Sequence, residues 1–321
     1  MRIVCILSLP LFGIFSGCGD KNTATNKAAG TPSGPETPLG IPSVPHMDNE
    51  AKSTLEIVAF GDWGNGNERM KQAMATFNTK FPHPDAVFLL GDNYYSDYEA
   101  ATFQLFTGHV APPGTNRAHY VILGNHDHIH GLKKQLNYNK QDPRWILPSH
   151  YYFKRFKRLG FDVCVWFLDT EGIMKGDKAQ ISWLESSITE NDPSCKWKLV
   201  NGHHPLMHAS PILGQCPKPL IPIRTILAKT QVHMYLSGHH HNTQFMQHAP
   251  TQVYYAIAGG IMQLRGNPDP SKFPVVGRNY FWGTAKTTAL LRLLVDAVSI
   301  KVEFHSGENP ASPVLYSHTI S

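Results

Sequence analysis

Residues 55–64 read LEIVAFGDWG and residues 86–95 read AVFLLGDNYY, so two short apolar runs each end at a Gly-Asp pair. Between them, apolar residues from Met70 to Phe77 recur at the spacing of three and four that predicts an amphipathic helix. A strand, a helix and a second strand form a βαβ unit, whose strands run parallel. We therefore expect Asp62 and Asp92 to follow the carboxyl ends of two strands.

The alternation of short apolar runs and amphipathic segments continues along the chain. Further strands are expected at residues 120–123, 162–168, 198–200, 232–236, 253–258, 288–294 and 298–304. Asp177 and Gln180 form a capping pair for a helix that reaches about Glu190, and residues 221–228 indicate another helix. Strands that alternate with helices predict an α/β domain.

Polar side chains of the types that bind metals follow five of these predicted strands. They are Asp62, Asp92, the run Asn125-His126-Asp127, His203, and the run His239-His240-His241. A glycine lies within two residues of each, which permits tight turns. Because ligand sites in α/β sheets form outside the carboxyl ends of the strands, we expect these five segments to converge.

The composition limits the class of protein. The chain has 321 residues, of which 41% are hydrophobic, so it can bury a core and is not expected to be disordered. The net charge of +5 includes no long run of Lys or Arg, so nucleic-acid binding is not expected. The 18 histidines favour a metalloprotein, because neutral imidazole is the commonest protein ligand for transition metals.

The N-terminal segment has the pattern of an export signal. Met1-Arg2 precedes an apolar run at residues 3–15, which is too short to span a bilayer and is followed by Ser16-Gly17-Cys18. This pattern resembles a bacterial lipoprotein signal at residues 1–18, with Cys18 carrying the lipid and anchoring the chain to a membrane. The alternative is an ordinary cleaved signal peptide in which Cys18 has no role.

The sequence also divides the rest of the chain. Residues 19–52 are rich in Thr, Ala, Gly, Pro and Asn and predict a disordered tether. Residues 53–321 form the predicted catalytic domain. We expect an exported protein, located in the periplasm or on the outer membrane, with the cell surface as an alternative location. Export allows one disulfide, and Cys195–Cys216 is favoured because Cys164 lies in an apolar run and is interpreted as a core thiol.

The five segments with their glycines, taken in this order, resemble the motif blocks of the calcineurin-like metallophosphoesterases. Within that superfamily they resemble the purple acid phosphatases, because the first block has Trp63-Gly64 in place of Asp-x-His and the second offers Tyr95. The resemblance is strongest to the small tartrate-resistant acid phosphatases and covers residues 55–304. Segments that recur there in order include Gly124-Asn-His-Asp-His128, Arg144-Trp145, Pro148, Tyr151-Tyr152, Leu168-Asp-Thr170 and Ser182-Trp-Leu184.

This resemblance implies a fold and a set of metal ligands. The implied fold is a single-domain, four-layer α/β/β/α sandwich. The implied ligands of Fe(III) are Asp62, Asp92, Tyr95 and His241. The implied ligands of a divalent ion, which is Fe, Zn or Mn, are Asp92, Asn125, His203 and His239, so that Asp92 bridges the two. Tyr94 and His204 are neighbours of the same types, and motif spacing favours Tyr95 and His203 over them.

The resemblance also implies catalytic residues. A metal-bound hydroxide would attack the phosphate in line, and His126 would protonate the leaving alcohol, with Asp127 orienting its ring. The alternative for His126 is an ordinary turn residue. Residues 212–216 lack the histidine that the family has there, and His208 is the expected substitute. If the backbone is extended at residues 239–241, His239 and His241 project together and His240 points elsewhere.

We expect a phosphomonoesterase of acidic optimum that acts on small phosphate esters. Phosphodiesters, nucleotides and phosphoproteins are alternative substrates for the same site, with the range set by loops such as residues 108–117 and 265–280. A binding lipoprotein without catalytic activity is the alternative from a different class. It is disfavoured because all seven ligand positions are intact.

Overall fold

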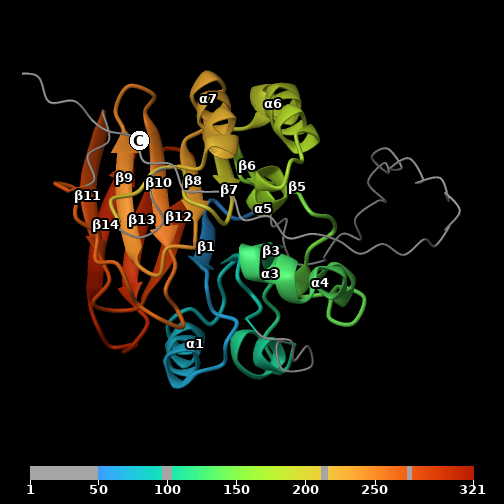
Figure 1. Cartoon of the computed structure of the whole chain (residues 1–321), viewed down its shortest axis with the longest axis vertical. Coiled ribbons are helices and arrows are strands. Elements are labelled where there is room, and N and C mark those ends of the chain that lie inside the picture. Colours follow the sequence, from blue (N-terminus) through green and yellow to red (C-terminus); the bar gives the residue numbers. More distant parts are fainter. Residues whose placement is uncertain (1–49, 96–102, 211–215, 273–276) are drawn as a thin grey trace, which may run out of the picture. The chain divides into compact units, whose positions relative to one another are not determined.

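The computed structural model describes residues 50–95, 103–210, 216–272 and 277–321 (Figure 1). The predicted signal peptide, Cys18 and all but the last three residues of the predicted tether lie outside these ranges. Lys52, at the end of that tether, is held by the domain, because its carbonyl accepts a hydrogen bond from Leu159 N and its ammonium pairs with Asp85 at 2.6 Å.

The first sheet has seven strands in the order β14-β13-β12-β1-β2-β3-β4. Their bounds are β1 Leu55–Phe60, β2 Ala86–Leu90, β3 His119–Ile122, β4 Trp145–Ile146, β12 Ala289–Val295, β13 Ile300–Ser306 and β14 Val314–Ile320. Strands β1 to β4 are parallel, and β12 adds to β1 in the antiparallel direction. The predicted βαβ unit is confirmed, and its two strands have the predicted ends.

The second sheet also has seven strands, in the order β11-β9-β10-β8-β7-β6-β5. Their bounds are β5 Tyr152–Arg158, β6 Phe161–Phe167, β7 Trp197–Asn201, β8 Met234–Ser237, β9 Thr243–His248, β10 Val253–Ala258 and β11 Arg278–Thr284. Strands β6, β7, β8 and β10 are parallel. Parallel strands therefore form the centre of the second sheet and one side of the first, which ends at β4; antiparallel strands complete both sheets.

The helices are short and lie between the strands in sequence. They are α1 Glu68–Lys80, α3 Asn125–His130, α4 Leu132–Tyr138, α5 Thr170–Met174, α6 Ala179–Asn191 and α7 Ile221–Lys229, with shorter helical turns at η1 Phe106–Val110, η2 Asp192–Ser194 and η3 Lys218–Leu220. The side chain of Asn67 caps α1 by accepting a hydrogen bond from Met70 N at 2.9 Å. The apolar face of α1, predicted from its spacing, is buried.

Strand β6 shows how the layers form. Its alternate residues Val163, Val165 and Phe167 belong to the core that the two sheets share. Cys164 and Trp166 point to the other face, where α6 and α7 cover the sheet. Across the shared core, Phe88 of β2 packs against Phe167 of β6 with ring centroids 5.1 Å apart. The four-layer sandwich that the resemblance implied is confirmed.

Two sequence predictions need correction. The disulfide joins Cys164 to Cys195, and Cys216 is a half-buried free thiol. Cys164 faces the layer that contains α6, and Cys195 lies in the same layer just before the chain enters β7. The burial of Cys164 therefore did not exclude it from a disulfide. Strands β4, β5, β9, β11 and β14 were missed. Strand β4 has only two residues, and partly exposed strands such as Arg278–Thr284 mix polar and apolar residues without clear alternation. Strand β9 is buried although it contains Thr, Gln and His residues.

Candidate metal centre and active site

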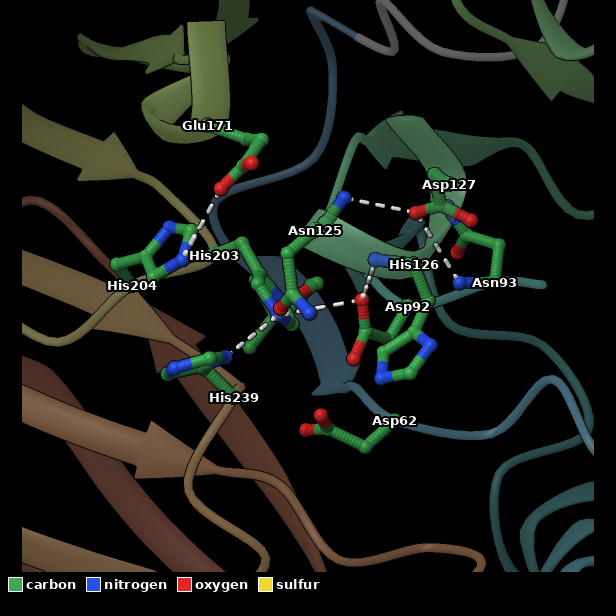
Figure 2. Close-up of polar contacts among 12 residues, drawn as sticks. Asp62, Asp92, Asn93, Asn125, His126, Asp127, Glu171, His203, His204 and His239 are labelled. Atoms are coloured by element: carbon green, nitrogen blue, oxygen red, sulfur yellow. Dashed lines mark hydrogen bonds and ion pairs between the residues drawn. The ribbon is translucent and has the colours of Figure 1, made fainter. Parts of the chain in front are cut away.

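The carboxyl ends of five parallel strands bring the predicted metal-binding residues together (Figure 2). Asp62 follows β1 and Asp92 follows β2, while Asn125 begins α3 just after β3. His203 follows β7, and the three histidines His239–His241 follow β8. All seven predicted ligands lie in one cluster, which divides into two sets of donor atoms.

The first set contains the hard donors expected to hold Fe(III). Tyr95 Oη donates to Asp92 Oδ2 at 2.8 Å, and it lies 3.4 Å from Asp62 Oδ1 and 3.5 Å from His241 Nε2. His241 Nε2 lies 3.6 Å from Asp62 Oδ1. A phenol, two carboxylates and an imidazole therefore point at a common centre.

The second set surrounds His203. Its Nε2 lies 3.3 Å from Asp92 Oδ1, 3.2 Å from Asn125 Oδ1 and 3.2 Å from His239 Nδ1. Asp92 thus contributes one carboxylate oxygen to each set. This is the arrangement that a bridging carboxylate requires.

The buried acidic groups of the cluster favour the binding of cations. Burial raises the pKa of Asp62 to about 7, with the Asp92 charge adding to the effect, and Asp62 Oδ2 has no hydrogen-bond partner. Burial and the same two carboxylates raise the pKa of Tyr95 far above its usual range. Although burial lowers the pKa of His203, Asp92 and Asp62 raise it to about 10. Buried anionic donors without enough positive charge fit a pair of metal ions.

The histidines differ in how ready they are to bind a metal. His203 Nδ1 must donate its proton to the Leu90 carbonyl at 2.8 Å, which leaves Nε2 to face the cluster as a ligand atom. Burial and the neighbouring His203 lower the pKa of His239 to about 3. Burial and Arg265 lower the pKa of His241 to about 4. Arg265 Nε donates to His241 Nδ1 at 3.1 Å. A neutral imidazole that binds a metal through Nε2 carries its proton on Nδ1 and cannot accept a hydrogen bond there, so ligation through Nε2 requires this hydrogen bond to break.

Three of the ligands have a backbone conformation that is rare for residues with a side chain. Asp62, Asp92 and His239 have φ angles of 59°, 51° and 63°. Such conformations cost on the order of 1 kcal/mol each and concentrate at functional sites. The backbone at His239 is therefore not extended, yet His239 and His241 both reach the cluster as predicted. Gly124 is required for a different reason: a Cβ there would overlap Asp92 Oδ1.

His126 lies at the mouth of the cluster. Its backbone N–H donates to Asp92 Oδ1 at 3.0 Å, and its ring packs on Tyr95 with centroids 4.4 Å apart. Its Nδ1 has no hydrogen-bond partner. The His126 side chain thus lies beside both sets of donor atoms, and its Nδ1 makes no hydrogen bond to the described residues.

Asp127 does not orient His126, and that expectation is wrong. Its buried carboxylate accepts hydrogen bonds from Gly124 N at 2.7 Å, Gln135 Nε2 at 2.8 Å and the backbone and side chain of Asn93 at 3.2 Å. Successive side chains on a helix differ in direction by about 100°, so Asp127 points away from His126 (Figure 2). Asp127 holds together the loops that carry Asp92 and Asn125.

A cleft of about 210 Å³ opens onto the cluster. It is lined by Asp92, Asn125, His126, Ser210, His239, His240, His241, Asn242 and Arg265. His208, expected to contribute here, is not among the described lining residues, and its ring packs on that of His240 with centroids 4.3 Å apart. His240 was expected to point away from the two ligand histidines; it lines the cleft and belongs to neither set of donor atoms. A role for His208 stays a prediction.

Two polar residues of this cleft, Ser210 and Asn242, were not predicted from the sequence, whereas Arg265 begins the loop at residues 265–280 that was expected to affect the substrate range. Ser210 and Asn242 hydrogen-bond to each other at 3.2 Å, and Asn242 also reaches the carbonyl of Gly266. Arg265 comes from the loop after β10. None of these belongs to a motif, and Asn242 could have been suspected only from its place directly after His241. No residue of the described loop 108–117 lines the cleft, so its expected effect on substrate range has no support there.

The calcineurin-like phosphoesterase family pattern matches residues 55–243, which span more than half of the chain. The chain belongs to the calcineurin-like phosphoesterases. This phosphoesterase is 31% identical over 254 residues to the tartrate-resistant acid phosphatase type 5 of Rattus norvegicus, covering 69% of this chain and 76% of the rat protein. It is 26% identical over 250 residues to purple acid phosphatase 4 of Arabidopsis thaliana, covering 70% and 73%. The predicted resemblance is confirmed.

Solved structures share the fold of this phosphoesterase. The purple acid phosphatase PPD1 from yellow lupin seeds superposes with a TM-score of 0.65 at 16% identity, covering 85% of this chain and 54% of that chain. GAP50, the anchor in the inner membrane complex of Plasmodium, superposes with a TM-score of 0.70 at 17% identity, covering 84% and 89%. Within the described ranges, no helix of this phosphoesterase is both long and apolar enough to cross a bilayer.

Proposed function

We propose that this phosphoesterase is an acid phosphatase that hydrolyses phosphate monoesters at a pair of metal ions. The observation that carries the proposal is the shared Asp92 carboxylate, whose two oxygens belong to two separate sets of donor atoms. The similarity to tartrate-resistant and purple acid phosphatases supports the choice of substrate class.

The donor chemistry supports Fe(III) in one position and a divalent ion, Fe, Zn or Mn, in the other. Asp62, Asp92, Tyr95 and His241 would hold the ferric ion, because phenolate and carboxylate oxygens are hard ligands. Asp92, Asn125, His203 and His239 would hold the divalent ion. When bound, the two metals lower the pKa of water and offset the charge of the phosphate.

The residues of the chain supply binding, orientation and a proton. Arg265 lies in the cleft beside His241 and is the guanidinium that can bind an incoming phosphate. Asn242 and Ser210 add polar groups on the same side. The His126 ring, whose Nδ1 has no hydrogen-bond partner among the described residues, lies where it can give a proton to the leaving oxygen.

The proposal is tested with the metal-loaded full chain and p-nitrophenyl phosphate in the presence of tartrate. We expect turnover at acidic pH, a purple protein and two metals in the active centre. The Asp92→Ala variant should lose activity by roughly 10³-fold or more, because both metals lose a ligand. Asp162→Ala, at a half-buried position near the start of β6, is the matched control and should keep activity. A loaded wild-type protein that hydrolyses no monoester would refute the proposal.

We also propose that the protein is exported and held at a membrane by lipid on Cys18. Support comes from the apolar run before Cys18 and from the Cys164–Cys195 disulfide, since disulfides persist in oxidising compartments. Labelled fatty acid should enter the wild-type protein and not the Cys18→Ser variant. Equal labelling of the two proteins would contradict the anchor.

A further inference from the structure

A second cluster of metal-binding side chains lies outside the site described above. It consists of His128 on α3, His150 in the loop before β5, and Asp169, which follows β6 and caps α5 by accepting from Gly172 N. His128 Nε2 lies 2.8 Å from Asp169 Oδ1 and 2.9 Å from Oδ2, and His150 Nδ1 lies 3.0 Å from Oδ2. One donor atom from each residue falls within 4.8 Å of the other two.

The burial of the three residues is graded. The Asp169 side chain is 1% exposed, that of His128 is 8% exposed and that of His150 is 43% exposed. Burial would raise the pKa of Asp169, but hydrogen bonds from His128, His150 and the Gly172 amide hold it at about 2. The carboxylate is therefore anionic at neutral pH, and the cluster is open to solvent on the His150 side.

We propose that His128, His150 and Asp169 form a third metal site, for zinc or a similar divalent transition ion, separate from the two-metal centre. Two imidazoles and one carboxylate, with a water molecule in a fourth position, form a known tetrahedral ligand set for zinc. Bonds of about 2.0–2.2 Å in that geometry put ligand atoms roughly 3.3 Å apart. The histidine–carboxylate separations of 2.8–3.0 Å would open by roughly 0.3–0.5 Å, and the two histidine nitrogens lie within 4.8 Å of each other.

None of the three residues is among the seven ligands of the first centre, and none lines its cleft. The third site nevertheless borders the supports of that centre. Helix α3, which carries His128, begins at Asn125, and α5 begins at Thr170, whose hydroxyl lies 2.8 Å from His204 Nδ1. The His204 ring packs on His239 with centroids 4.3 Å apart. A metal at the third site would clamp α3 to the β6–α5 junction.

The same three side chains could instead be held by hydrogen bonds alone, and His150 offers the variant that separates the two cases. His150→Gln keeps an amide N–H that can donate to Asp169 but removes the imidazole ligand. Because His150 is partly exposed and lies in a loop, this change should not disturb folding. His83→Gln, at an exposed loop position, is the matched control.

The experiment counts all metal ions per chain (iron, zinc and manganese) by elemental analysis after equilibration with zinc and desalting, in the full wild-type chain, His150→Gln, His83→Gln, and each of these combined with Asp92→Ala. We expect three metal ions in the wild type and in His83→Gln, two in the first centre and one zinc at the third site. Adding His150→Gln should lower the count by one, both in the wild-type chain and in the Asp92→Ala variant. Zinc should also raise the Tm of Asp92→Ala, and His150→Gln should reduce that rise.

A wild-type count of two, or a count unchanged by His150→Gln, would overturn the third site and leave a hydrogen-bonded cluster. The measurement needs no turnover, so failure of the proposed phosphatase activity does not affect it. Circular dichroism of each variant verifies the fold before metals are counted.

Discussion

The Cys164–Cys195 disulfide makes a quantitative prediction about stability. It joins Cys164, in the middle of β6, to Cys195, which lies just before β7, with a sequence separation of 31. In the chain-entropy model, a closed loop of this length stabilises the folded state by about 3.7 kcal/mol at 25 °C. Cys195 is only half buried, whereas Cys164 is fully buried, so Cys195→Ala removes the bond without opening a core cavity.

We therefore expect Cys195→Ala to lower the free energy of unfolding by about 3.7 kcal/mol and the Tm by roughly 7–10 °C. Cys216→Ala makes the same chemical change at a free, half-buried thiol and should stay within about 1 kcal/mol of the wild type. The assay is urea unfolding followed by tryptophan fluorescence, with and without reductant. Reductant should bring the wild type to the level of Cys195→Ala and leave that variant unchanged.

The outcome also decides between the two cysteine pairings. If Cys216→Ala lost as much stability as Cys195→Ala, the bond would be Cys195–Cys216, as the sequence first suggested. If neither variant nor reductant changed the unfolding midpoint, the argument from loop closure would be refuted.

Three further predictions concern single side chains. Arg265→Ala should raise KM for a phosphate monoester about 10-fold or more while kcat changes less, as measured by steady-state kinetics, because one charge-assisted contact to phosphate is lost. Burial would raise the pKa of Glu303, but basic neighbours on β12 and β13 lower it from 4.5 to about 2, so its contribution is complete above pH 4.5 and disappears toward pH 2. Glu303→Gln should thus lower the unfolding free energy by roughly 1–2 kcal/mol at pH 7, and urea titrations should show the difference shrinking between pH 4.5 and 2. Gln135→Leu removes a donor from the buried Asp127 carboxylate and should cost about 1–3 kcal/mol in the same assay, with no loss of metal ligands.

Local sequence signals were sufficient for the strands that carry the site. Apolar runs followed by Gly-Asp or Gly-Asn located the ends of β1, β2 and β3, and Gly-His follows β7 and β8. The five segments converge because parallel strands end at one edge of each sheet. The residues that matter there are polar and follow directly after a buried strand. This combination is readable without knowledge of the rest of the fold.

The contacts that depend on packing between distant segments could not be read in the same way. Asp127 is adjacent to His126 in sequence, but the helix turns the two side chains apart. Arg265 reaches His241 from a loop without a motif. Cys164 pairs with Cys195 because of how the chain crosses the α6 layer, which no local pattern records.

The left-handed backbone at Asp62, Asp92 and His239 has an evolutionary consequence. A glycine at any of these positions would relieve the backbone at no steric cost, so the present residues are kept at the expense of stability. A duplicate of this gene released from catalysis would gain stability by accepting glycine at these three places first. In a lineage of such copies, glycine at position 62, 92 or 239 would mark the loss of enzymatic selection.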